Sequence, residues 1–206
     1  MAIHFSNIRR SLCLGLVSFL TAVSALVAVA PNTALADPFT YSDVSAGYHS
    51  SCSLSTDGRA LCWGWNYQGY LGVGSRETSV TVPSVVATPA GVRFVSIEAG
   101  SYFTTCGLTT TGAVYCWGES ALGRWTGAPS ITPVLVALPS GVVATQLSVG
   151  ATHACVISND GVYCWGNWST GELGVGEIEP TVTPVHVTLP NNQVAVSIAA
   201  GVAFTC

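Results

Sequence analysis

The tripeptide Cys-Trp-Gly occurs three times in this chain, as Cys62-Trp63-Gly64, Cys116-Trp117-Gly118 and Cys164-Trp165-Gly166. The copies recur about every 50 residues, a spacing in the range of known repeat proteins. A second cysteine precedes each copy, at Cys52, Cys106 and Cys155. A glycine stands shortly before each of these cysteines and before the last residue of the chain, at Gly47, Gly100, Gly150 and Gly201. Markers that keep one period identify a structural unit repeated along the chain.

The pattern within each unit predicts β-strands. Valine-rich alternating stretches such as 92–97 and 194–198 are typical of half-buried strands. Glycine-containing triplets at 56–58, 110–112 and 159–161 are typical of hairpin turns. Four short strands in about 50 residues is the pattern of one β-propeller blade. We therefore predict an all-β fold, an incomplete ring of four-stranded antiparallel blades. Its full repeats and the start of a further one lie approximately at 44–94, 95–146, 147–197 and 198–206.

The turn of the first hairpin predicts a disulfide. With a three-residue loop centred on Asp57, Ser55 faces Arg59 and Cys52 lies opposite Cys62. Opposed positions on neighbouring strands bring two cysteines within bridging range. Each such bridge closes a loop of about ten residues and is expected to stabilise the fold by roughly 3 kcal/mol.

The other hairpins extend this prediction. The same count pairs Cys106 with Cys116, whereas the third hairpin is one residue shorter, so that Cys155 and Cys164 need a shifted turn. Metal binding is the alternative for these cysteines, but none of the pairs has the C-x₂-C spacing of a zinc site. Cys206 has no hairpin partner in the sequence and is predicted to be unpaired.

Residues 1–36 have the pattern of a signal peptide. Arg9 and Arg10 precede an apolar run over 12–30, and Ala34-Leu35-Ala36 has the small-x-small form of a cleavage site. We expect cleavage after Ala36 and a secreted, periplasmic or cell-envelope protein with no stable membrane association afterwards. An uncleaved anchor stays open, because the apolar run is near the length that spans a bilayer.

Charge and composition exclude two classes of protein. The six basic residues are all arginine, and against ten carboxylates they leave a formal net charge of −4. A nucleic-acid partner is not expected of such a chain, because binding to phosphate needs an excess of basic residues. With 49% hydrophobic and 8% charged residues, the chain also lacks the composition of a disordered protein.

Aromatic residues divide into repeated and non-repeated positions. The tryptophans of the Cys-Trp-Gly motifs recur in every unit and are expected to pack within and between blades. The remaining candidates follow these motifs in predicted loops, and they are Trp65, Tyr67, Tyr70, Arg124, Trp125 and Trp168. Non-repeating aromatic and arginine side chains in loops fit a recognition surface. The alternative is that these rings cap the blade core locally.

The sequence offers no catalytic constellation. His49 and His153 recur near one repeat position, which favours a structural role between strands or blades, and His186 has no identifiable partner. The chain contains no Gly-x-Ser-x-Gly nucleophile motif. We therefore expect no enzyme, no cofactor and no metal.

The third unit carries a family resemblance. Its segments 150–155 (Gly-Ala-Thr-His-Ala-Cys), 159–166 (Asn-Asp-Gly-Val-Tyr-Cys-Trp-Gly) and 171–176 (Gly-Glu-Leu-Gly-Val-Gly) resemble the regulator of chromosome condensation repeat. The resemblance is strongest to its secreted bacterial form, in which paired cysteines flank the hairpin. It implies a β-propeller, usually of seven blades. The eukaryotic namesake binds chromatin and promotes nucleotide exchange on a small GTPase, and secreted relatives include protein inhibitors of β-lactamase.

These observations lead to a functional expectation. We expect an exported, non-catalytic propeller that binds an unknown protein partner, and an inhibitor-like role is one form of this function. A glycan-binding propeller and an enzyme with its chemistry on one blade loop are the alternatives. Closing even a four-bladed ring takes about 200 residues, more than remain after the signal segment. We therefore expect a piece of a longer chain, or else copies linked through Cys206.

Overall fold

The computed structural model describes residues 40–118, 129–166, 170–176 and 181–206. The predicted signal segment 1–36 lies outside these residues, as do Arg124, Trp125 and Trp168. No helix among the described residues is both long and apolar enough to cross a membrane.

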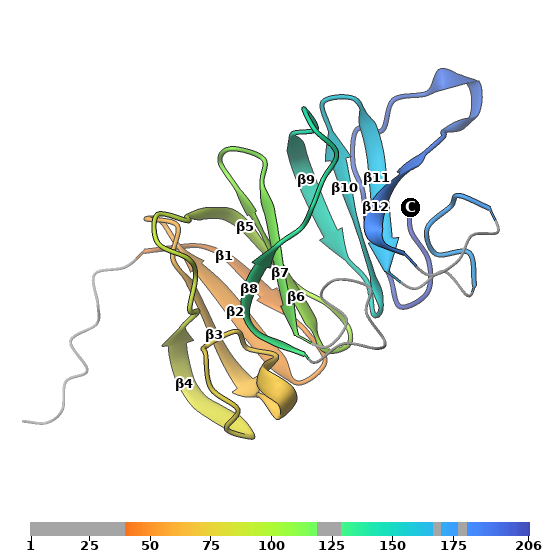
Figure 1. The fold of residues 1–206 in the computed structure, drawn as a ribbon. Coiled ribbons are helices and arrows are strands. Elements are labelled where there is room, and N and C mark those ends of the chain that lie inside the picture. Colours follow the sequence, from red (N-terminus) through yellow and green to blue (C-terminus); the bar gives the residue numbers. More distant parts are fainter. Residues whose placement is uncertain (1–39, 119–128, 167–169, 177–180) are drawn as a thin grey trace, which may run out of the picture. The chain divides into compact units, whose positions relative to one another are not determined.

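The described residues form three sheets, each of four antiparallel strands joined in sequence order (Figure 1). Blade 1 contains β1 (Tyr41–Ala46), β2 (Ser50–Ser55), β3 (Ala60–Trp65) and β4 (Ser79–Val85). Blade 2 contains β5 (Phe94–Ala99), β6 (Thr104–Thr109), β7 (Val114–Gly118) and β8 (Ser130–Leu135). Blade 3 contains β9 (Ala144–Val149), β10 (His153–Ser158), β11 (Gly161–Gly166) and β12 (Thr181–Val187). Two short 3₁₀ turns, η1 (Tyr67–Gly69) and η2 (Pro190–Asn192), lie in the connections. The all-β, four-stranded prediction is confirmed, and the three sheets do not close a ring.

The central hairpins of blades 1 and 2 have the register that their turns predict. Ser55 N–H donates to the carbonyl of Arg59, and Gly58 has φ +81°, so the loop spans three residues. Cys52 therefore pairs with Cys62 across β2 and β3, with 4.1 Å between their Cα atoms. Blade 2 repeats this arrangement, with Cys106 bonded to Cys116.

The third hairpin reaches the same result with a tighter turn. Ser158 pairs directly with Gly161, which leaves a two-residue loop and compensates for the missing residue. Cys155 consequently lies opposite Cys164, and the two sulfurs are bonded. Cys206 is free and exposed.

Neighbouring blades share hydrophobic cores built around the motif tryptophans. Trp117 of blade 2 is fully buried in a cluster whose other members include Leu54 and Leu71 of blade 1. Trp165 of blade 3 lies in the corresponding cluster with Leu108 of blade 2. Trp63, the equivalent residue of blade 1, is only half-buried. Each buried motif tryptophan therefore fastens its blade to the preceding one.

The marker glycines explain how closely the blades approach. A Cβ atom on Gly47 would lie 2.7 Å from the carbonyl oxygen of Gly100. A Cβ on Gly100 would lie 2.5 Å from the oxygen of Gly150, and one on Gly150 would lie 2.6 Å from that of Gly201. Real Cβ atoms do not approach so closely, and only glycine leaves the space that this backbone contact between blades occupies. We call this repeated contact the glycine ladder.

The first strands of the blades are also joined by side chains. Ala99 N–H donates to the Ser45 hydroxyl at 2.9 Å, and Ala200 N–H donates to the Ser148 hydroxyl at 2.9 Å. At the equivalent position in blade 2 stands Glu98, which is half-buried. Burial and the nearby Asp43 carboxylate raise the pKa of Glu98.

Candidate functional site

Three of the predicted recognition residues lie at the end of β3 and just beyond it. Trp65 is the last residue of β3 and is 37% exposed, and Tyr67 in η1 is exposed. Tyr70, in contrast, is only 4% exposed. It packs inside the molecule, as the alternative of a local cap supposes, and supports the exposed rings from below.

The backbone places Trp65 beside the β1–β2 turn through the glycine of the first Cys-Trp-Gly motif. Gly64 has φ +112°, and a Cβ there would collide with the carbonyl oxygen of His49. The same oxygen accepts a hydrogen bond from Trp65 N–H at 2.8 Å. The motif glycine therefore sets the Trp65 ring next to the His49 ring, with centroids 5.4 Å apart.

The loop after Trp65 is held by a buried amide. Asn66 is fully buried, its Nδ2 donates to the Ser75 carbonyl at 3.2 Å, and its Oδ1 accepts from Leu71 N–H at 3.0 Å. Gly74 N–H donates to the carbonyl of Ile131 on β8, which ties this loop to blade 2. Tyr67 and Tyr70 are therefore presented from an ordered loop.

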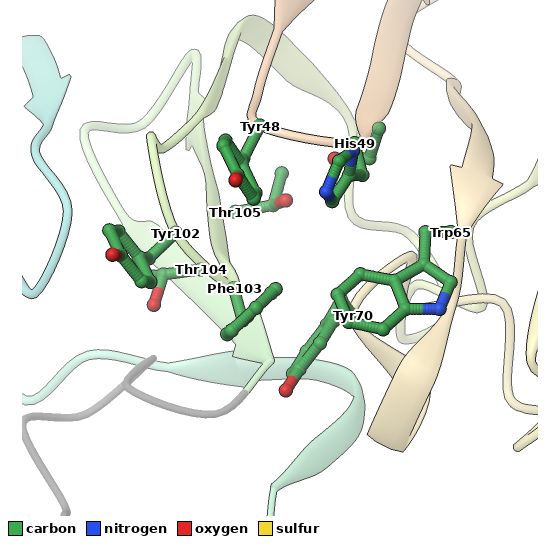
Figure 2. A pocket seen from close by; sticks show the side chains of 9 residues that line it. Tyr48, His49, Trp65, Tyr70, Tyr102, Phe103, Thr104 and Thr105 are labelled. Atoms are coloured by element: carbon green, nitrogen blue, oxygen red, sulfur yellow. The ribbon is translucent and has the colours of Figure 1, made fainter.

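Five aromatic rings from blades 1 and 2 make a closed circuit of contacts (Figure 2). In order around the circuit, they belong to Tyr48, His49, Trp65, Phe103 and Tyr102. Successive centroids are 4.0, 5.4, 5.3 and 5.6 Å apart, and the closing distance from Tyr102 to Tyr48 is 5.9 Å. Four of these contacts are tilted by 53° to 87°, whereas the two tyrosines are nearly parallel at 7°. Such tilted rings meet as walls rather than as one flat stack.

Further rings reinforce the circuit from outside. Tyr70 stacks on Phe103 with centroids 4.3 Å apart and planes 12° apart. Tyr67 stacks on Trp65 at 5.5 Å and 15°. The rings thereby hold one another in place, although Tyr67 is open to solvent and only Tyr70 is buried.

The circuit surrounds a small hollow, which we call the aromatic hollow. Besides the five rings it is lined by Tyr70 and by the hydroxyl-bearing residues Ser50, Thr104 and Thr105. Its volume of about 10 Å³ is close to the space that one water molecule occupies. Among the described residues, no carboxylate, lysine or arginine lines it. The arrangement suits the tip of one side chain and not a whole small molecule.

The other candidate residues lie apart from this site. His153 is 3% exposed, and its Nε2 is 2.9 Å from the Thr205 hydroxyl, consistent with a structural role between units. Burial lowers the pKa of His153. His186 on β12 meets the ring of Tyr163 edge to face at 5.2 Å. The described part of the chain contains no cluster of three or more metal-ligating side chains.

Sequence reasoning missed Tyr48, Tyr102 and Phe103, and it gave His49 a structural role where the structure shows an exposed ring. The sequence contains a signal that could have identified these aromatic residues. The third unit has only small residues, Ala151 and Thr152, between its marker glycine and His153. Tyr48 and Tyr102 each stand four residues before the first cysteine of their hairpin, where the third unit has Ala151, so this aromatic position is not kept in every unit.

The sequence matches known repeats over most of residues 41–206. Residues 57–106 and 159–206 match the Regulator of chromosome condensation (RCC1) repeat, and a second description of the same repeat matches 41–69, 94–124 and 144–170. The chain belongs to the RCC1 repeat family. Its assignment to the secreted bacterial type remains a prediction.

Relatives of this RCC1-repeat chain have diverse functions. The ultraviolet-B receptor UVR8 of Arabidopsis thaliana is 30% identical over 162 residues, which is 77% of this chain and 36% of the receptor. The human E3 ubiquitin-protein ligase HERC2 is 27% identical over 168 residues, which is 79% of this chain but 3% of the ligase. The chain thus spans about a third of UVR8 and a small part of HERC2.

Solved structures show the same fold. Human WBSCR16 superimposes with a TM-score of 0.70 at 22% identity, covering 81% of this chain and 44% of that one. Prp20p of Saccharomyces cerevisiae, studied for its binding to Gsp1p and histones, gives 0.67 at 23% identity, covering 80% and 42%. Both likenesses support propeller blades for this RCC1-repeat chain.

Proposed function

We propose that this protein is an exported, non-catalytic scaffold that binds another protein through the aromatic surface of blades 1 and 2. The observation that carries the proposal is the exposure of large rings on an ordered surface. Tyr48 is 63% exposed and Tyr102 is 50% exposed, beside the partly exposed Trp65. Clustered exposed aromatic side chains are typical of protein interfaces, where tyrosine and tryptophan contribute much of the binding energy.

The family relationship supports protein binding as the class of function. The fold neighbour Prp20p has been studied in binding to Gsp1p and histones, and the yeast RCC1 protein has been crystallised with Kap60. A propeller whose variable loops contact a partner needs no catalytic group.

Export is supported by the cysteines. Three hairpins each carry a disulfide, and such bonds persist in oxidising compartments. Together with the signal pattern over 1–36, this leads us to expect that the exported protein begins at Asp37. Mass spectrometry of the N-terminal peptide from the host's extracellular fraction measures this directly, and a peptide that begins at Met1 would contradict export by cleavage.

The binding test compares variants on the same blade. Immobilised wild-type protein should retain a specific protein from the native extracellular fraction, and the double variant Tyr48→Ser/Tyr102→Ser should lose it. Tyr41→Ser is the matched control, because Tyr41 is 53% exposed on β1 but does not line the aromatic hollow. Equal retention by all three proteins, or retention by none, would refute this surface as the binding site.

A glycan is the second candidate ligand. Trp65 and Tyr67 form a nearly parallel pair of exposed rings, which suits stacking against the face of a sugar. A glycan array with the wild-type protein tests this, and an array without binding excludes it.

A further inference from the structure

We infer that the aromatic hollow binds the ammonium group of a lysine side chain on the partner protein. The inference rests on the proposed protein-binding function and specifies the chemistry of its central contact. It depends on three properties of the hollow, namely the closed circuit of rings, its size and its charge.

The circuit of rings provides the attraction. Aromatic faces carry partial negative charge, and a cation within about 6 Å of a ring centroid is attracted to it. Successive centroids of the circuit lie only 4.0 to 5.9 Å apart, so a cation held between two neighbouring rings can lie within that limit of both. One of these rings is the indole of Trp65, and indole is the aromatic group that attracts cations most strongly.

Size selects the kind of cation. The volume of about 10 Å³ accommodates a group the size of water. An ammonium tip has this size, whereas the planar guanidinium of arginine is larger and carries its charge over several atoms. Ser50 and Thr105 also line the hollow, and hydroxyl groups can accept ammonium N–H bonds.

Charge indicates that the lysine comes from outside. The 206 residues contain no lysine, so these residues of a second copy do not supply the group. Its formal net charge of −4 favours the approach of a basic partner. Among the residues that the structure describes, none of those lining the hollow is an arginine.

The test uses three small probes that differ only at the side-chain tip. These are N-acetyl-lysine methylamide, its uncharged counterpart N-acetyl-norleucine methylamide, and N-acetyl-arginine methylamide. Binding is followed by NMR at the indole N–H of Trp65, which is assigned with the Trp65→Phe variant. We expect the lysine probe to bind about 2- to 30-fold more tightly than the norleucine probe, and more tightly than the arginine probe. Tyr48→Leu/Tyr102→Leu should abolish this preference, and Tyr41→Leu should retain it.

The outcomes separate this inference from the proposed function. Equal binding of the lysine and norleucine probes would show that the hollow has no preference for a cation. Stronger binding of the arginine probe would show that it prefers a guanidinium group. Either result, or an indole signal that no probe changes, overturns the inference. If partner capture nevertheless depends on Tyr48 and Tyr102, the protein-binding function stands without the lysine contact.

A second experiment acetylates the lysines of the proteins in the extracellular fraction before capture. Since this chain has none, loss of capture then reports on the partner alone and supports the inference, and undiminished capture overturns it.

Discussion

Replacing Trp117 by alanine tests how the blades are joined. Trp117 is 0% exposed and occupies the shared core of blades 1 and 2, where its indole ring lies against Gly72. Removing a fully buried tryptophan costs about 3–5 kcal/mol, because buried contacts are lost and a cavity remains. Trp63 has the same place in its motif but is half-buried. The matched variant Trp63→Ala should therefore lose about half as much stability or less.

The assay is urea unfolding at neutral pH with the disulfides intact, followed by far-ultraviolet circular dichroism. The free energies of unfolding of the wild-type protein and the two variants are compared. The indole N–H of Trp117 is buried without a hydrogen-bond partner among the described residues, so Trp117→Phe should lose much less stability than Trp117→Ala. Equal losses for Trp117→Ala and Trp63→Ala would refute the view that the motif tryptophan fastens each blade to the preceding one.

Three further predictions concern the contacts between units. Gly100→Ala should destabilise the protein by about 1–3 kcal/mol in thermal or urea unfolding, since the new Cβ would lie 2.5 Å from the carbonyl oxygen of Gly150; unchanged stability would contradict the glycine ladder. The raised pKa of Glu98 means that the folded protein binds a proton there more readily than the unfolded chain, so ionisation weakens the fold as pH rises above the ordinary value of 4.5. Glu98→Gln should accordingly be more stable than wild type at pH 7 and equally stable near pH 3, and a constant difference would refute this. The lowered pKa of His153 has the opposite effect on stability, because the unfolded chain binds a proton at this residue more readily than the folded protein. The stability that neutral His153 contributes is therefore complete above the ordinary pKa of 6.5 and is lost as pH falls. His153→Gln should flatten the fall in stability between about pH 6.5 and 5, as measured by urea unfolding at each pH.

The hairpins show how far local sequence determines structure. A glycine that can take positive φ fixes the turn, the turn fixes the register, and the register brings Cys52 opposite Cys62. The third hairpin left a choice, because a shorter segment is compatible with several turns. The two-residue loop between Ser158 and Gly161 restores the cysteine pairing, whereas the sequence alone predicts only that the turn is shifted.

The aromatic hollow could be predicted only in part. The sequence predicts Trp65 and Tyr67 as recognition residues, because they follow a repeated motif but are not themselves part of the repeat. Tyr48 and Tyr102 lie more than 50 residues apart, and they meet because β5 packs beside β1 and β2. Comparison of repeats aligns equivalent positions, but it does not show which residues of one blade face the next. The burial of Tyr70 likewise follows from the stacking of Phe103 of blade 2.

The glycine ladder has a consequence for engineering. The spacing between successive blades is set by main-chain atoms, from Gly47 through Gly100 and Gly150 to Gly201, so it does not depend on which side chains the neighbouring turns carry. The turns that follow these glycines can therefore carry different side chains, as Tyr48-His49 and Ala151-Thr152 do, while the backbone contact between blades is kept. One repeat spacing can thus present a different surface at each junction between blades.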